Sequence, residues 1–302
     1  MSEPSGVAAR VHARDRGPSV SFELYPPRTE AGDAALWRSV ERLTEVRPDF
    51  WSVTYGASGS NRETSRGVVR RLLADPAPPV AHLTCIGATR AELLGVAAAL
   101  VSDGVRDFLA LRGDPPADGS WVPRAGGVNR AFELVALLRG IEPLIGERIS
   151  VGAAATPEAV RGAEAAELDP QRCGDLLALN AKQAAGADYA VSQVFFDARS
   201  YVRYLEVARA AGVTIPVLPG VVPLSDPARL RRLEAVSGVP VPPALLAVLD
   251  READEAGRRA AGRTLGAELV AAVLEAGAPG VHVYTFNQHE AALDLLTAAG
   301  LR

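Results

Sequence analysis

The chain has 302 residues, of which 48% are hydrophobic and 23% are charged, so it can bury a large core as one big domain or two ordinary ones. Its net charge of −4 provides no basic field of the kind that nucleic-acid binding requires, which argues against a nucleic-acid partner. The two cysteines form no CxxC pair and no stretch reaches about 18 apolar residues, so we expect a cytoplasmic protein without a membrane span.

Residues 1–18 contain no apolar signal-peptide core, and we expect them to be a short disordered segment before a domain that spans residues 19–302. From there on, short apolar runs alternate with segments whose apolar spacing of three and four suits helices. The runs are VSFELY (20–25), FWSVTY (50–55), VAHLTCI (80–86), DFLALRG (107–113), ISVGAA (149–154), YAVSQVFF (189–196), PVLPGVV (216–222) and VHVYTF (281–286). This alternation indicates a parallel sheet buried on both faces.

Eight such strand–helix units in one chain match a (β/α)8 TIM barrel better than a doubly wound sheet. No linker, short repeat or low-complexity tract divides the chain, so we predict a single α/β domain. Residues 237–259 are the longest departure from the repeat, and they predict extra helices between strands seven and eight. In such a barrel the reactive groups lie at the C-terminal ends of the strands and in the loops that follow.

Polar residues interrupt or end several of these apolar runs. They are Glu23 in the first run, Thr54 in the second, Arg112 and Asp114 at the end of the fourth, Gln193 in the sixth and Tyr284 in the eighth. Any one of them alone is more often structural, since buried polar groups usually satisfy the backbone. Two carboxylates and an amide that converge from three strands predict a catalytic site at the mouth of the barrel.

At these residues the chain resembles the methylenetetrahydrofolate reductases. The resemblance rests on seven motifs in order, SFELYPPRT, FWSVTYGASGSNRETS, AHLTCIGAT, ALRGDPP, AVSQVFFD, PVLPGVVPLSD and HVYTFN, over residues 19–300. It implies the reduction of 5,10-methylenetetrahydrofolate to 5-methyltetrahydrofolate by a reduced nicotinamide, and therefore a small-molecule folate substrate.

The resemblance also implies catalytic roles. The substrate must open to an iminium before it accepts hydride, and Glu23 matches the acid that protonates a ring nitrogen; its apolar strand would favour the protonated form. Asp114 matches an aspartate that lies against the pterin, where its charge favours the cationic iminium. Gln193 matches a glutamine that bonds the pterin edge.

Further contacts follow from the same resemblance. Tyr284 and Gln288 are expected to bind substrate, although Gln288 stands where the family leads us to expect an arginine near the folate tail. Thr54 is expected to bond the acid or the cofactor. His82, Arg112 and Lys182 are candidate nicotinamide contacts, with a structural role as the alternative, and for Arg112 a pair with Asp114. The spacing of the four histidines suits no metal site.

Most members of the family carry FAD, and the chain departs from them where they hold it. Residues 151–164, VGAAATPEAVRGAE, lack the tyrosine and histidine rings of the family. The next helix keeps Asp175 and Lys182 but has Ala178 and Ala181 where polar and basic contacts are expected. No GxGxxG or P-loop replaces these contacts. We therefore expect NADH or NADPH to give its hydride directly to folate, with FAD doubtful.

Three alternatives remain open at this point. The first is an FAD-dependent reductase that holds its flavin through backbone contacts. The second is a related methylene-tetrahydropterin reductase with a deazaflavin donor, and the third is a non-enzymatic folate-binding relative. We expect a monomer or a small homo-oligomer, and the sequence leaves open the choice of NADH or NADPH and the number of glutamates on the folate.

Overall fold

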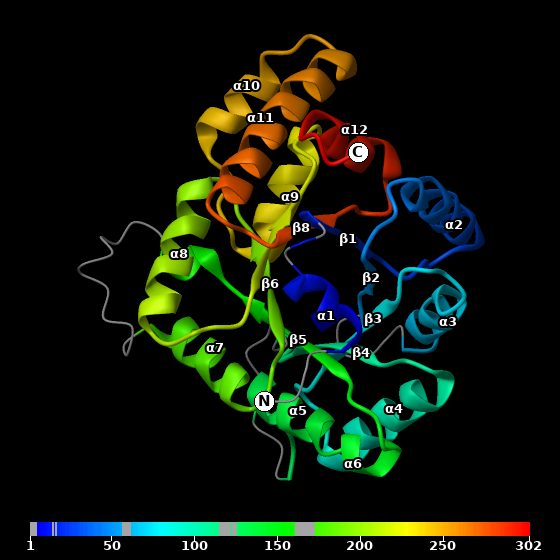
Figure 1. Ribbon diagram of the computed structural model, residues 1–302. Helices are drawn as coiled ribbons and strands as arrows, with labels where there is room; N and C mark the ends of the chain where they lie inside the picture. Colours follow the sequence, from blue (N-terminus) through cyan, green and yellow to red (C-terminus); the bar gives the residue numbers. More distant parts are fainter. Residues whose placement is uncertain are drawn as a thin grey trace.

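The computed structural model describes residues 5–13, 15, 17–55, 62–114, 122, 126–160 and 173–302 of the chain. Eight parallel strands form a closed barrel in sequence order, with the last strand paired to the first (Figure 1). They are β1 (Ser19–Leu24), β2 (Phe50–Val53), β3 (Pro79–Thr84), β4 (Asp107–Leu111), β5 (Ser150–Ala155), β6 (Tyr189–Val194), β7 (Val217–Val221) and β8 (Gly280–Tyr284). The predicted single-domain (β/α)8 barrel is thus confirmed.

Apart from α1, the helices lie around the outside of these strands (Figure 1). They are α1 (Gly6–His12), α2 (Glu30–Thr44), α3 (Arg62–Leu72), α4 (Arg90–Asp103), α5 (Ala131–Arg139), α6 (Glu142–Ile145), the 3-10 helix η2 (Pro157–Val160), α7 (Gly174–Ala184), α8 (Ala198–Ala210), α9 (Pro227–Ser237), α10 (Pro243–Asp250), α11 (Glu255–Glu275) and α12 (His289–Ala298). Of the extra helices predicted in residues 237–259, the structure has α10, which packs against α9 and α11, and the first turn of α11. Within the described ranges, no helix is long and apolar enough to cross a bilayer.

Local sequence signals fix where several helices begin and end. Thr29 caps α2 by accepting a hydrogen bond from the backbone N–H of Gly32 at 3.1 Å. Thr89 and Glu92 form a capping box at the start of α4, and Gly104, with a φ of 109°, ends it in the left-handed region. These caps satisfy backbone groups that would otherwise lack partners at the helix ends.

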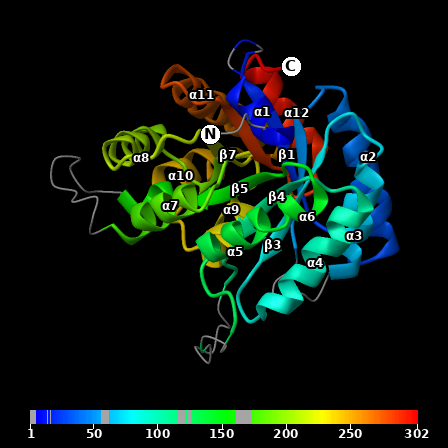
Figure 2. The ribbon, with the colours of Figure 1, turned by 60° about the horizontal axis from the view of Figure 1, so that its bottom comes forward.

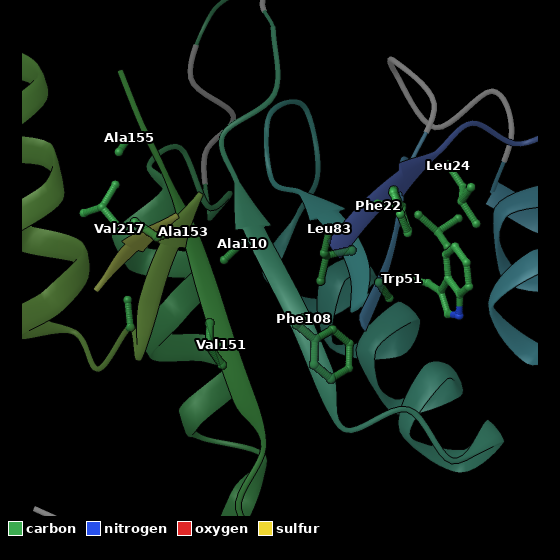
Figure 3. Packing of buried hydrophobic residues seen from close by; sticks show 14 of the residues in the cluster. Phe22, Leu24, Trp51, Leu83, Phe108, Ala110, Val151, Ala153, Ala155 and Val217 are labelled. Carbon is green, nitrogen blue, oxygen red and sulfur yellow. The ribbon is translucent and has the colours of Figure 1, made fainter. Parts of the chain in front are cut away.

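The main hydrophobic core lies between the strands and the helices. Figure 3 shows Phe22, Leu24 and Trp51 together in this layer, and the rings of Phe22 and Trp51 stack with centroids 5.6 Å apart. Because neighbouring residues of a strand point to opposite faces, Ser21 and Glu23 point into the barrel. The hydrophobic layer therefore determines which residues of β1 reach the interior.

Helix α1 packs at the N-terminal end of the barrel, so the expectation that residues 1–18 are disordered is wrong for Gly6–His12 (Figure 2). Its apolar face packs on a second cluster inside the barrel, formed by Phe50, Val80, Leu109, Tyr189, Val191 and Leu218. The backbone N–H of Val7 donates to Asp107 Oδ1 at 2.7 Å, and that of Ala8 donates to Ser150 Oγ at 3.1 Å. Seven residues are too few for a clear periodic signal, and these tertiary contacts order the helix.

Candidate active site

A buried carboxyl group lies in the barrel interior, near the C-terminal end of β1. Glu23 is 6% exposed, and its Oε2 lies 3.8 Å from Nε2 of His82 and 3.9 Å from Nε2 of His282. The strand register places Glu23 beside Ser52 of β2 and Tyr284 of β8. The structure therefore brings together three sequence-predicted residues, Glu23, His82 and Tyr284, and adds His282.

Each of the two histidines is held by a serine. Nε2 of His82 shares a hydrogen bond with Ser52 Oγ, and Nδ1 of His282 shares one with Ser21 Oγ at 2.8 Å. Burial lowers the pKa of His82 to about 4, although the charge of Glu23 acts in the opposite direction. His82 is therefore uncharged at neutral pH. Nε2 of His282 is buried and has no hydrogen-bond partner among the described residues.

Two tyrosines complete the surroundings of Glu23. Burial raises the pKa of Tyr25 above its ordinary value, and the charge of Glu23 and a hydrogen bond to it add to this effect. Burial also raises the pKa of Tyr284, again with a contribution from Glu23. The Tyr284 hydroxyl donates to the carbonyl of Ser192 at 2.8 Å. We expected Tyr284 to bind substrate, but its hydroxyl hydrogen is already used in a hydrogen bond within the protein.

The segment after β4 carries the second carboxylate of the prediction. Gly113 has a φ of 84°, and a Cβ there would lie 2.8 Å from Ile86 Cγ2, so glycine lets the chain turn beside the neighbouring loop. Asp114 is exposed, and its side chain bonds to no other described residue. Arg112 is also exposed, donates to the carbonyl of Gly113 at 3.3 Å, and forms no ion pair with Asp114. The pairing considered for these two residues is absent.

Gln193 and Thr54 are both half-buried at the ends of their strands. Oε1 of Gln193 accepts from the backbone N–H of Val194 at 2.8 Å, which leaves its NH₂ group without an acceptor in the described part of the chain. The backbone N–H of Thr54 donates to Leu24 at 3.1 Å, and its carbonyl accepts from Ser65 Oγ at 2.9 Å. The backbone of Thr54 thus links β1, β2 and α3.

Two polar residues kept from the family's flavin region make internal bonds. Lys182 is 9% exposed, and its Nζ donates to the carbonyl of Ala154 at 2.8 Å; burial lowers its pKa. Asp175 accepts from the Tyr204 hydroxyl at 2.9 Å and from the backbone N–H of Thr156 at 3.2 Å. Both side chains therefore hold α7 against neighbouring elements.

The remaining positions of α7 offer little to a dinucleotide. Ala178 and Ala181 have no side-chain donor, and β5 leads through Ala155 into Thr156 and Pro157 without a ring. Ala155, Pro157, Ala178 and Ala181 thus provide neither an aromatic ring nor a side-chain donor at these positions. Residues 161–164 of the departure from the family, and residues 56–61 within the motif FWSVTYGASGSNRETS, lie outside the described residues.

Gln288 occupies the N-cap position of α12 without a side-chain capping hydrogen bond, and its Oε1 accepts from Nη1 of Arg229 on α9. It lines a cleft beside β8 whose lining does not include Glu23. In the described part of the chain, no group of three or more His, Cys, Asp or Glu side chains could hold a metal ion.

Sequence reasoning did not assign His282, Tyr25 or Ser21 to the site. His282 could have been identified from the sequence, because residues two apart in a strand share a face and Tyr284, two residues later in β8, was already a candidate. The rings of His282 and Tyr284 meet edge to face with centroids 5.4 Å apart. By the same reasoning, Ser21 lies on the same face of β1 as Glu23.

The family model described as methylenetetrahydrofolate reductase matches residues 9–300 of the chain. The chain is 33% identical over 291 residues to a 5,10-methylenetetrahydrofolate reductase of Salmonella typhimurium, with 94% of this chain and 91% of the relative covered. It is 30% identical over 293 residues to methylenetetrahydrofolate reductase (NADH) 1 of Zea mays, which covers 96% of this chain and 49% of that relative.

The fold also resembles that of a solved structure. An uncharacterised protein from Clostridium thermocellum that binds two copies of 5-methyl-5,6,7,8-tetrahydrofolic acid has a TM-score of 0.60 and 12% sequence identity, with 94% of this chain and 95% of that chain covered. At this identity the likeness concerns the fold alone.

Proposed function

The chain belongs to the methylenetetrahydrofolate reductase family, and we propose that it transfers hydride directly from NADH to 5,10-methylenetetrahydrofolate, with Glu23 as general acid and without FAD. The family match supports the reaction, and the NADH in the name of the Zea mays relative supports the donor. The observation that carries the assignment of the acid is the buried Glu23 carboxyl group, beside which the only basic groups within 4.0 Å in the described part of the chain are two histidines.

The first step is the proton transfer that opens the substrate ring. The methylene carbon bridges two nitrogens and accepts hydride poorly until one C–N bond breaks. Glu23 donates its proton to the departing nitrogen and becomes a carboxylate. When Ser21 donates to Nδ1 of His282, Nε2 carries the hydrogen and faces that carboxylate from 3.9 Å, so the imidazole favours the negative charge electrostatically, without a direct hydrogen bond.

The second step is hydride addition to the iminium. The exposed carboxylate of Asp114 favours the positive charge of this intermediate, and the NH₂ group of Gln193 orients the pterin edge. Hydride from the nicotinamide adds to the iminium carbon, so one N–CH₃ group forms and NADH becomes NAD⁺. Glu23 then takes up a proton from solvent.

The bonding of α7 supports a reaction without flavin. Lys182 and Asp175 bond within the fold, and Ala178 and Ala181 on the same helix offer no side-chain donor to a flavin dinucleotide. A protein that stores no hydride must bind NADH and folate together. Direct transfer in a ternary complex follows from this requirement.

Isotope transfer tests the proposal. The protein is incubated with methylenetetrahydrofolate and with NADH deuterated at either face of nicotinamide C4, and the product is analysed by mass spectrometry. Direct transfer places one deuterium in the new methyl group from one of the two donors. Loss of that deuterium to water would indicate a flavin, whose N5 hydrogen exchanges. Formation of product only with a reduced deazaflavin would favour the tetrahydropterin reductase alternative.

A further inference from the structure

The N-terminal half of the barrel interior is filled by a segment that precedes the first strand. Helix α1 closes this end of the barrel, and its apolar side chains lie in one buried cluster with side chains of the strands. The members of this cluster are Val7, Ala8 and Val11 of α1 together with Phe50, Val80, Leu109, Tyr189, Val191 and Leu218. The space under the strands is therefore occupied by α1 and by no other described helix.

Two polar side chains bind the start of α1, and a glycine allows its close approach. Asp107 accepts the backbone N–H of Val7 at 2.7 Å, and Ser150 accepts that of the next residue at 3.1 Å. Gly6 has a φ of 54°, and a Cβ added there would overlap Oδ1 of Asp107 and lie 3.1 Å from its Cγ. A methyl group at position 6 would thus displace either the helix or the carboxyl group, and the bond between them would be lost in both cases.

Phe50 connects this cluster with the imidazole beside the acid. The strand register pairs Ser21 with Phe50 on one side and with His282 on the other. The rings of Phe50 and His282 stack with centroids 5.7 Å apart and planes 13° apart, and Ser21 Oγ bonds to Nδ1 at 2.8 Å. These two contacts hold the imidazole in the orientation that places its Nε2 3.9 Å from Oε2 of Glu23.

The effect of this imidazole on the acid depends on its exact position and on the absence of water. At 3.9 Å it acts on Glu23 electrostatically, and such an interaction weakens as the local dielectric constant rises. His282 is fully buried. Displacement of α1 would leave a cavity beside Phe50, and the ring could then relax away from the imidazole.

From this chain of contacts we propose that α1 and Phe50 position His282 for the reaction. The helix holds the phenylalanine ring, and the ring holds the imidazole that faces Glu23. The inference rests on the proposed function. Phe50 is a positioning residue, since it acts through the imidazole, and α1 affects catalysis from the end of the barrel opposite the mouth.

Steady-state kinetics of Gly6→Ala and Phe50→Leu test this link. We expect each substitution to lower kcat about three- to tenfold, because the imidazole loses its orientation. The folate KM should stay nearly unchanged, since neither residue lies at the mouth of the barrel. In a His282→Asn background, neither substitution should lower kcat further, because both act through that imidazole.

Two matched controls separate this effect from a general loss of stability. Gly17→Ala adds the same methyl group in the same N-terminal segment, at a φ of 81°, where no described residue lies within 4 Å of the added Cβ. Phe108→Leu truncates an equally buried ring, but one that packs in the core between strands and helices. Either control can lower the melting temperature, and both should keep the wild-type kcat.

The NMR signals of the histidine ring nitrogens provide a readout that needs no turnover. His12 is the last residue of α1, and its ring bonds to the carbonyl that precedes β6 at 2.9 Å, so it reports the docking of the helix. Gly6→Ala should shift the signals of His12 and His282 together, and Phe50→Leu should shift those of His282. His289, on α12, is the internal reference and should stay unchanged.

The two proposals fail in different ways. An unchanged kcat in either variant, or a further loss of kcat when either is combined with His282→Asn, would overturn the positioning role and leave the reaction intact. If the wild-type protein reduces no folate, the proposed function fails, and the NMR signals alone decide on the link. His282 signals that move with those of His12 would then support it, and His282 signals that stay fixed in both variants would overturn it.

Discussion

The Glu23 carboxyl group and the His282 imidazole meet across the β1–β8 pairing that closes the barrel, with Oε2 and Nε2 3.9 Å apart. The register pairs Ser21 with His282 and Glu23 with Tyr284, so the acid and the imidazole come from residue pairs that are two positions apart and share the inner face of the barrel. Nε2 of His282 has no hydrogen-bond partner among the described residues. The Glu23 carboxyl group is the acidic group that lies within 4.0 Å of it, so we expect the imidazole to act on this carboxyl group.

Replacement of the acid should remove most of the turnover. Glu23→Gln keeps the shape of the side chain but cannot supply an acidic proton, so kcat should fall by about 10²–10⁴ while folate affinity stays within a few-fold. Steady-state rates and folate titration measure both quantities. Glu41→Gln, at an exposed position on α2, is the control. A Glu23→Gln protein that kept more than about a third of the wild-type turnover would show that the proton comes from elsewhere.

His282→Asn should lower kcat about tenfold, less than the loss in Glu23→Gln, because the imidazole acts only through the carboxylate. The two substitutions together should then cost no more than Glu23→Gln alone, as expected for residues that act as one unit. Additive losses in the double variant would mean that His282 acts independently, for instance on packing.

His82 should make the fold sensitive to acid. Its folded-state pKa of about 4 lies below the ordinary histidine value of 6.5, so between these values the unfolded chain binds the proton and the folded protein does not. Stability should therefore fall as the pH falls through this window, by about 3 kcal/mol at most. Burial raises the pKa of Asp107 to about 6, and its titration acts in the opposite sense. The wild type and a His82→Gln variant both retain Asp107, so the difference between their stabilities reports the titration of His82.

Denaturant unfolding of wild type and His82→Gln across this pH range is the measurement. The variant should lose less stability than the wild type on acidification, even if it is less stable at neutral pH. Parallel pH profiles for the two proteins would show that the titration of His82 is not coupled to folding.

Asp114 and Gln193 should act on the folate and not on the nicotinamide. Asp114→Asn removes the charge that favours the iminium and should lower kcat, whereas Gln193→Ala should lower kcat and also raise the folate KM. Rates measured with each substrate varied in turn distinguish these effects. A variant in which only the KM for NADH changed would contradict the placement.

The barrel could be predicted because each strand is a short apolar run, and the run VSFELY (20–25) corresponds to β1 at Ser19–Leu24 with a shift of one residue. Helix α1 could not, since its order depends on Asp107 and Ser150, at positions about 100 and 140 residues away in the sequence. The local sequence pattern predicts an element whose apolar residues are themselves periodic. It does not predict a short helix that becomes ordered only through contacts with distant parts of the chain.

The same distinction holds at the site. Glu23 could be predicted because a carboxylate inside an apolar strand is conspicuous in the sequence. The bond between Arg229 and Gln288 joins residues that are 59 positions apart, and neither lies in a pattern that points to the other. The parallel pairing of β7 with β8 brings the segments that follow these strands together, so the bond becomes visible only in three dimensions.

Direct hydride transfer without flavin is the central claim, and the absorbance spectrum of the freshly purified protein between about 350 and 500 nm tests it most directly. We predict a colourless protein whose rate does not change on addition of FAD and whose initial-rate plots for NADH and folate intersect. A yellow protein with stoichiometric FAD, or a bound chromophore that NADH alone reduces before folate is added, would contradict the claim.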